Sequence, residues 1–173
     1  MTLSNVASTG KIKVSWEPVE GAKEYKVYRA TTKSGTDKLM KTTTAASYTN
    51  TSVDAGKTYY YRVVAVHENS TANSTYSEIK SRTCDLARPV VSVSLNSSGK
   101  PVVSWKSISG AEEYEIYVYN SSGKLLRTAD VDGTKWTDKS AKAGTTYTYK
   151  VVAEHDNDSA NSAKSTGASI KSK

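Results

Sequence analysis

The side chains that could carry out catalysis are few in this sequence of 173 residues. The chain holds two histidines, His67 and His155, and a single cysteine, Cys84. Catalysis requires a nucleophile, a base and stabilising groups within hydrogen-bond reach of one another, and nothing in the spacing brings these residues together. A lone cysteine forms neither an internal disulfide nor a cysteine-based zinc site. We therefore expect a protein that is not an enzyme and that uses no cofactor and no metal.

Polar loops offer a second kind of chemistry. Each histidine opens a stretch of oxygen-bearing side chains, and the candidate binding residues there are His67, Glu68, Asn69, His155, Asp156 and Asn157. Loops on a rigid scaffold are frequent sites of recognition. A calcium ion requires about six to eight oxygen ligands, and the second stretch does not have the spacing of a known cation loop. The alternative to a recognition loop is an ordinary turn rich in Asn and Ser.

Both loops belong to a tandem repeat that covers the chain. The matched segments are residues 13–16 and 102–105, 21–25 and 110–114, 55–65 and 143–153, 67–69 and 155–157, and 72–74 and 160–162. Two copies of one domain follow, and we place domain 1 at residues 1–84, a short linker at residues 85–89 and domain 2 at residues 90–173. Pro89 stiffens this linker, which favours an elongated and semi-rigid pair.

Apolar residues alternate with polar ones inside each copy. Ile12, Val14 and Trp16 alternate with lysine and serine, and Tyr59 and Tyr61 begin a second alternating run. This period of two indicates strands that are buried on one face, and turns that contain glycine separate the runs. The sequence predicts an all-β protein of two consecutive seven-stranded antiparallel β-sandwiches. Aromatic residues must fill much of each core, because Phe is absent and Leu and Ile are few.

Each copy resembles a fibronectin type III domain. Trp16 and Trp105 are similar to the tryptophan on the second strand of that family, and the Gly-x-x-Tyr patterns that end at Tyr59 and Tyr147 are similar to its entry into the sixth strand. The position of these two tyrosines suits a tyrosine corner, whose hydroxyl bonds to nearby backbone. The first strand of copy one, before Lys11, looks abbreviated. The style of the motifs resembles bacterial members of the family, which implies a secreted or cell-surface protein.

The outer face of the sheet that holds the third, sixth and seventh strands is a candidate binding surface. Strand parity turns Tyr28, Tyr60 and Arg62 outward together in copy one, and Tyr117 holds the place of Tyr28 in copy two. Exposed tyrosines beside a cation suit both protein hot spots and stacking against sugars. The alternative is that tyrosine is simply a good strand former whose ring covers its neighbours. Copy one is the stronger candidate because it has more tyrosines on this face.

Charge and hydropathy exclude two other classes of partner. The net charge is +7, but the excess is spread over both copies, whereas a nucleic-acid binder clusters its Lys and Arg on one face. The richest apolar run, residues 63–66, is far shorter than the ~20 residues that a membrane-spanning helix needs. We therefore expect no binding of nucleic acid and no insertion into a membrane.

These observations predict a non-catalytic, monomeric module of a larger bacterial surface or secreted protein, located outside the cell. In the first hypothesis the module serves adhesion and binds a host or cell-surface protein or a glycan. In the alternative it is a passive spacer that presents a neighbouring catalytic or wall-anchoring domain, or an accessory carbohydrate-binding module. A binder should expose a contiguous tyrosine patch, whereas a spacer should have evenly polar faces.

Overall fold

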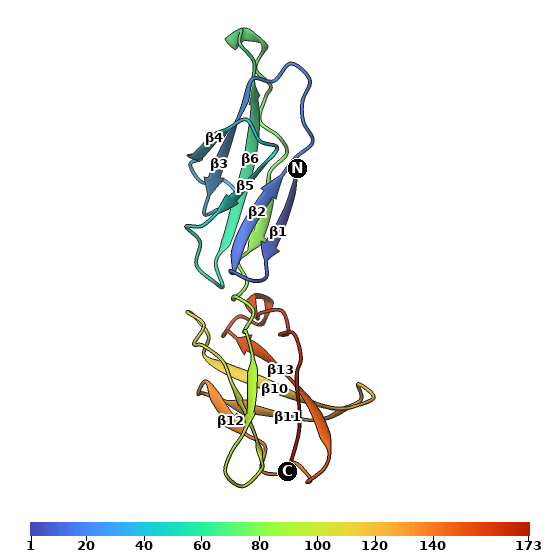
Figure 1. Cartoon of the computed structure of the whole chain (residues 1–173). Helices are drawn as coiled ribbons and strands as arrows, with labels where there is room; N and C mark the ends of the chain where they lie inside the picture. Colours follow the sequence, from blue (N-terminus) through green and yellow to red (C-terminus); the bar gives the residue numbers. More distant parts are fainter. The chain divides into compact units, whose positions relative to one another are not determined.

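The computed structural model describes residues 1–173 and shows a chain of fourteen strands and two short 3-10 helices (Figure 1). The chain divides into two compact units. Unit 1 contains Met1–Val6 and Gly10–Asp85, and unit 2 contains Ala7–Thr9 and Leu86–Lys173. The division between Asp85 and Leu86 lies inside the predicted linker.

Unit 1 consists of two antiparallel sheets. One sheet has the order β1-β2-β5, and the other has the order β4-β3-β6-β7. The elements are β1 (Thr2–Val6), β2 (Lys11–Ser15), β3 (Glu24–Ala30), β4 (Lys38–Thr43), β5 (Ser47–Asn50), β6 (Thr58–Val66), the 3-10 helix η1 (Ser70–Ala72) and β7 (Lys80–Thr83).

Unit 2 repeats this arrangement. Its sheets have the orders β12-β9-β8 and β11-β10-β13-β14. The elements are β8 (Ser92–Leu95), β9 (Pro101–Ser104), β10 (Glu113–Asn120), β11 (Leu125–Val131), β12 (Lys135–Thr137), β13 (Thr146–Glu154), the 3-10 helix η2 (Asp158–Ala160) and β14 (Ala168–Lys171). The predicted fold class, two seven-stranded antiparallel sandwiches, is therefore confirmed.

The first strand of unit 1 is longer than the sequence suggested. β1 pairs with β2 over five residues, from Thr2 opposite Ser15 to Val6 opposite Lys11. The expectation that this strand is abbreviated is therefore wrong. The apolar signal of β1 is weak because only Met1 and Leu3 of this end of the chain pack against the core, and its pairing rests on backbone hydrogen bonds.

Tyrosines fill much of each core, and backbone groups satisfy their hydroxyls. The hydroxyl of Tyr59 accepts a hydrogen bond from the backbone N–H of Asp54 at 3.1 Å, and the hydroxyl of Tyr147 accepts one from Lys142 at 3.1 Å. These contacts confirm the predicted tyrosine corners. The hydroxyl of Tyr25 accepts a further bond from the N–H of a turn residue, so each of these rings also ties a loop to the core.

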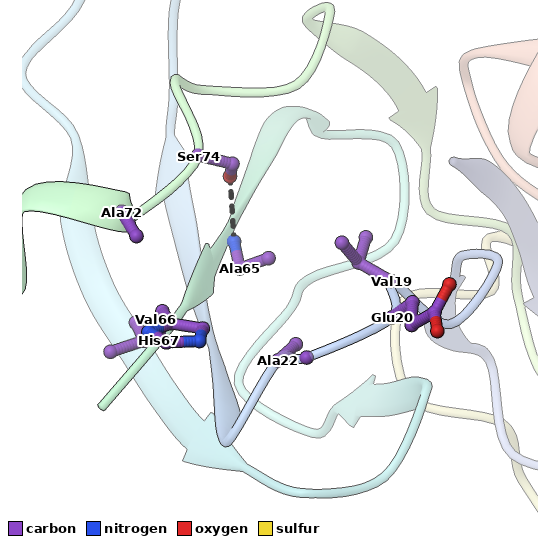
Figure 2. Close-up of a pocket in the computed structure, with 9 residues that line it drawn as sticks. Val19, Glu20, Ala22, Ala65, Val66, His67, Ala72 and Ser74 are labelled. Atoms are coloured by element: carbon purple, nitrogen blue, oxygen red, sulfur yellow. Dashed lines mark hydrogen bonds between the residues drawn. The ribbon is translucent and has the colours of Figure 1, made fainter. Parts of the chain in front are cut away.

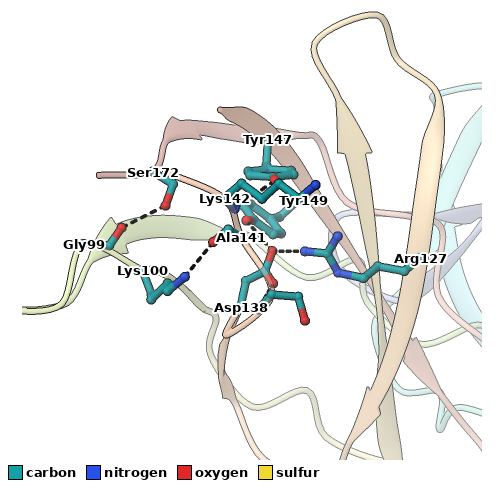
Figure 3. Close-up of polar contacts among 10 residues, drawn as sticks. Gly99, Lys100, Arg127, Asp138, Ala141, Lys142, Tyr147, Tyr149 and Ser172 are labelled. Carbon is teal, nitrogen blue, oxygen red and sulfur yellow. Dashed lines mark hydrogen bonds and ion pairs between the residues drawn. The ribbon is translucent and has the colours of Figure 1, made fainter. Parts of the chain in front are cut away.

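The two units solve the same burial problem with different polar pairs. In unit 1 the side-chain amide of Asn50 donates to the hydroxyl of buried Tyr61 at 2.8 Å, and burial is the main reason why the pKa of Tyr61 is raised to about 12. In unit 2 the hydroxyl of Tyr149 donates to Asp138 at 2.8 Å. The guanidinium of Arg127 pairs with the same carboxylate (Figure 3).

Serine hydroxyls replace part of a strand beside β6 and β13. Ser77 and Val63 exchange two hydrogen bonds, because the serine N–H donates to the carbonyl of Val63 and the hydroxyl accepts from the N–H of Val63. The same exchange joins Ser165 to Val151. Ser74 and Ser162 bind in this way one step further along. These serines lie three residues apart in each unit, so the chain follows its neighbouring strand without the alternation of a strand.

Removal of one buried serine hydroxyl should destabilise unit 2 more than the matched change destabilises unit 1. We expect Ser165→Ala to lower the free energy of unfolding of unit 2 by ~1–3 kcal/mol, because the buried N–H of Val151 loses its acceptor. Ser77→Ala should have a smaller effect, since Ser77 is only half-buried and water can replace its hydroxyl. Urea unfolding of both variants measures the difference. Equal losses would contradict this role of burial.

The ion pair of unit 2 should be needed only because Asp138 is charged. Arg127→Leu should destabilise unit 2 by about 3–5 kcal/mol, because it leaves the carboxylate of Asp138 buried without a cation. Adding Asp138→Asn reproduces the neutral pair of unit 1 and should recover most of this loss. Thermal and urea melts of the single and double variants test the expectation. A double variant as unstable as the single one would show that Arg127 acts by packing alone.

Candidate functional site

The larger sheet of unit 1 carries an aromatic patch on its outer face. Tyr28 on β3 lies directly opposite Arg62 on β6 and opposite Leu39 on β4. Residues opposite each other in antiparallel strands project from the same face. Tyr76, from the extended segment that follows η1, packs against Tyr28. We call Tyr28, Leu39, Arg62 and Tyr76 the outer tyrosine face.

Ring contacts and one ion pair hold the outer tyrosine face together. The rings of Tyr28 and Tyr76 meet edge to face, with 5.3 Å between their centroids. The guanidinium carbon of Arg62 lies 5.6 Å from the centroid of the Tyr76 ring. Arg62 also pairs with Asp37 at 3.6 Å. The aromatic rings are thus fixed in place while Tyr76 and Leu39 each remain 48% exposed.

Tyr60 lies on the same face of β6 as Arg62 but at a different feature. It is opposite Ala30 on β3 and Ser81 on β7. Its neighbours Thr31, Thr32 and Thr58 line with it a shallow hollow of about 290 Å³. The predicted trio is therefore partly brought together: Tyr28 and Arg62 are adjacent, and Tyr60 borders the hollow.

Tyr76 and Leu39 were not among the predicted residues. Tyr76 lies in the segment where serines replace regular strand pairing, so a period of two does not place its side chain. Leu39 lies where β4 pairs with β3 across a shift in register, which changes the face that parity assigns. The available signal was the exposed aromatic position between two spaced serines, Ser74 and Ser77.

The matching face of unit 2 covers its tyrosines with lysines. The Nζ of Lys164 lies 3.1 Å from the centroid of the Tyr117 ring and 3.3 Å from the hydroxyl of Tyr119. Lys150 lies over the ring of Tyr119. The hydroxyl of Tyr117 donates to Glu115, and this hydrogen bond is the main reason why the pKa of Tyr117 is raised. The ring of Tyr117 therefore already has a cation on its face.

One substitution between the copies accounts for much of this contrast. By the repeat offset, Tyr76 of unit 1 corresponds to Lys164 of unit 2. The other end of the unit 2 face is acidic, and burial followed by repulsion from Glu115 and Glu113 raises the pKa of Glu154. The same scaffold thus presents an aromatic surface in unit 1 and a charged surface in unit 2.

The predicted loop of unit 1 uses most of its polar groups to fold itself. The Nδ1 of His67 accepts from the N–H of Asn69 at 3.0 Å, and the N–H of His67 donates to Asn73. The Oδ1 of Asn69 accepts from the N–H and the hydroxyl of Thr71, which caps η1. Glu68 lies 3.7 Å from Lys23, and both side chains are mostly exposed, so this pair is weak.

The loop of unit 2 repeats these contacts. The Nδ1 of His155 accepts from the N–H of Asn157 at 3.0 Å, and the N–H of His155 donates to Asn161 at 2.8 Å. The Oδ1 of Asn157 accepts from the N–H of Ser159, and Asp156 is exposed. The local bonds support the reading of these loops as Asn and Ser turns, and their role in recognition stays a prediction.

A small hollow lies beside the histidine of unit 1. It has a volume of about 80 Å³, and Val19, Ala22, Ala65, His67 and Ala72 contribute to its lining (Figure 2). The imidazole packs against Gly21, whose φ of +76° favours glycine. The lining is mainly aliphatic, which suits an apolar side chain better than an ion.

The remaining candidate groups form no reactive centre. No group of three or more His, Cys, Asp or Glu side chains could hold a metal ion. Cys84 is buried, its thiol donates to the carbonyl of Gly10 at 3.0 Å, and burial raises its pKa. A thiol with a raised pKa is a poor nucleophile. No helix has the length and apolar character to cross a membrane.

Comparison with known proteins gives one partial relative. No family model matches the chain. An amylopullulanase of Thermoanaerobacter thermohydrosulfuricus is 34% identical over 79 residues, which is 45% of this chain and 5% of that enzyme. The match thus covers a stretch about the length of one unit within a far larger protein.

Solved structures match the whole chain at low sequence identity. The alpha chain of the chicken interferon gamma receptor is 13% identical with a TM-score of 0.73, and the match covers 99% of this chain and 96% of that one. A segment of two fibronectin type III domains from chicken tenascin is 18% identical with a TM-score of 0.58, and covers 99% and 97%. Together with the strand order and the tyrosine corners, these matches show that the chain is a tandem of two units with the fibronectin type III fold.

Proposed function

We propose that this chain is a non-catalytic binding module of a larger extracellular protein, carried on a bacterial surface or secreted. The observation that carries the proposal is the outer tyrosine face, where exposed Tyr76 and Leu39 flank Tyr28 and Arg62. Tyrosine and arginine are the residue types enriched at binding hot spots. The binding partner is a cell-surface protein or a glycan.

The fixed geometry of this face supports binding. Tyr28 and Arg62 hold the Tyr76 ring through an edge contact and a cation–π contact, so docking a partner loses little side-chain freedom at that ring. Rigid aromatic anchors lower the entropic penalty of association. Asp37 balances the charge of Arg62, which leaves an apolar patch with a polar edge.

A spacer role is the second candidate, and the comparison with the amylopullulanase favours it. A segment that resembles this chain forms only 5% of that enzyme. The chain would then be an accessory part of a carbohydrate-active protein, either holding a catalytic domain at a distance or binding its α-glucan substrate. The charged face of unit 2, with its covered tyrosines, suits this role better than the face of unit 1 does.

Removing the two exposed apolar side chains of the outer tyrosine face should abolish binding. We expect Tyr76→Ala with Leu39→Ser to weaken binding at least ~30-fold, the loss typical of a hot spot, and to leave the thermal melt unchanged. The measurement is capture of cell-surface proteins by the 173-residue chain together with a glycan array that includes amylose and pullulan.

The matched control changes the same places in unit 2. Lys164→Ala with Leu125→Ser alters the counterpart of Tyr76 and an exposed leucine, and should leave affinity unchanged. If both double variants weaken binding equally, the outer tyrosine face is not the site. If no protein and no glycan binds the unmodified chain saturably, the binding proposal fails and the spacer role takes its place.

A further inference from the structure

The end of each unit that carries the 3-10 helix differs in burial between the two copies. In unit 2, Leu86 donates its backbone N–H to the carbonyl of Ala160 at 2.7 Å. Leu86 is 1% exposed and Ala160 is fully buried. This end of unit 2 therefore holds an extended segment by one backbone hydrogen bond and one buried aliphatic side chain.

The corresponding positions of unit 1 are uncovered. Ala72 corresponds to Ala160 by the repeat offset, and it is exposed, with no donor of the chain at its carbonyl. Two further pairs show the same difference, buried in unit 2 and more exposed in unit 1: Ser162 against Ser74, and Trp105 against Trp16.

Unit 1 has a formed site at this place. The aliphatic hollow described above is lined by Ala72 itself, by Val19 and Ala22 from the turn before β3, and by Ala65 from β6 (Figure 2). Val19 is 51% exposed there. An exposed valine beside a free backbone acceptor matches what the Leu86 segment meets in unit 2, an aliphatic surface with one carbonyl.

We propose that this hollow is a docking site for an extended peptide segment with an aliphatic side chain, supplied by the end of another copy of this unit. The N–H of that residue binds the carbonyl of Ala72, and its side chain covers Val19 and Ala22. Copies of the unit then join by the same contact at every step, as neighbouring units of repeat proteins do. The proposal is independent of the outer tyrosine face, which lies on other elements.

The repeat indicates where the docking residue belongs. Thr2 pairs with Ser15 as Ser92 pairs with Ser104, so Met1 corresponds to Val91 and the place of Leu86 lies five positions ahead of Met1. The test adds the sequence Asp-Leu-Ala-Arg-Pro-Val, copied from residues 85–90, directly before Met1 of the full chain. The matched control has Ser in place of Leu.

The readouts are hydrogen exchange, resolved by peptide, and thermal unfolding of unit 1. The leucine extension should slow exchange over residues 65–74 and raise the unfolding midpoint of unit 1 by ~4–8 °C. The serine extension should do neither, and neither extension should alter residues 151–165 of unit 2. Equal exchange and equal midpoints for the two extensions would overturn the proposal.

A second variant calibrates the measurement in the unmodified chain. Leu86→Ser should speed exchange over residues 153–162, because the same contact is already present in unit 2. If Leu86→Ser changes exchange there while the leucine extension leaves unit 1 unchanged, the contact is specific to unit 2 and the proposal is wrong.

Discussion

Both cores depend on giving every buried tyrosine hydroxyl a hydrogen-bond partner. Without Phe, small sandwiches must use tyrosine rings for volume, and a buried hydroxyl without a partner is destabilising. Tyr59 and Tyr147 find backbone N–H groups in the turn before their own strands. Tyr61 and Tyr149 find Asn50 and Asp138. The positions of turns and of the few buried polar side chains follow from this requirement.

Because that requirement fixes the interior, differences between the copies are concentrated on the surface. The replacement of Tyr76 by Lys164 turns an aromatic patch into one where a lysine covers the ring of Tyr117. The exchange of Asn50 for Asp138 brings in Arg127 as its counter-ion. Duplication thus kept the scaffold while the outer face and one buried pair diverged.

The loops around the two histidines show how the same residues serve stability rather than chemistry. His67 and Asn69 spend their acceptors on neighbouring N–H groups, and His155 and Asn157 do the same. These bonds form the 3-10 turn that carries Ala72 in one unit and Ala160 in the other. The turn matters because it presents a backbone carbonyl at the end of the unit, beside an aliphatic surface.

The sequence by itself determined the repeat, the two sandwiches, the tyrosine corners and the outward direction of Tyr28 and Arg62, because alternation with period two and local turn signals encode them. It did not determine the length of β1, whose pairing rests on backbone bonds, or the place of Tyr76. That residue follows serines spaced by three, so local periodicity carries no information about its face. Only the tertiary structure decided which tyrosines stay open, because a ring is covered by residues from other strands, such as Lys164 over Tyr117.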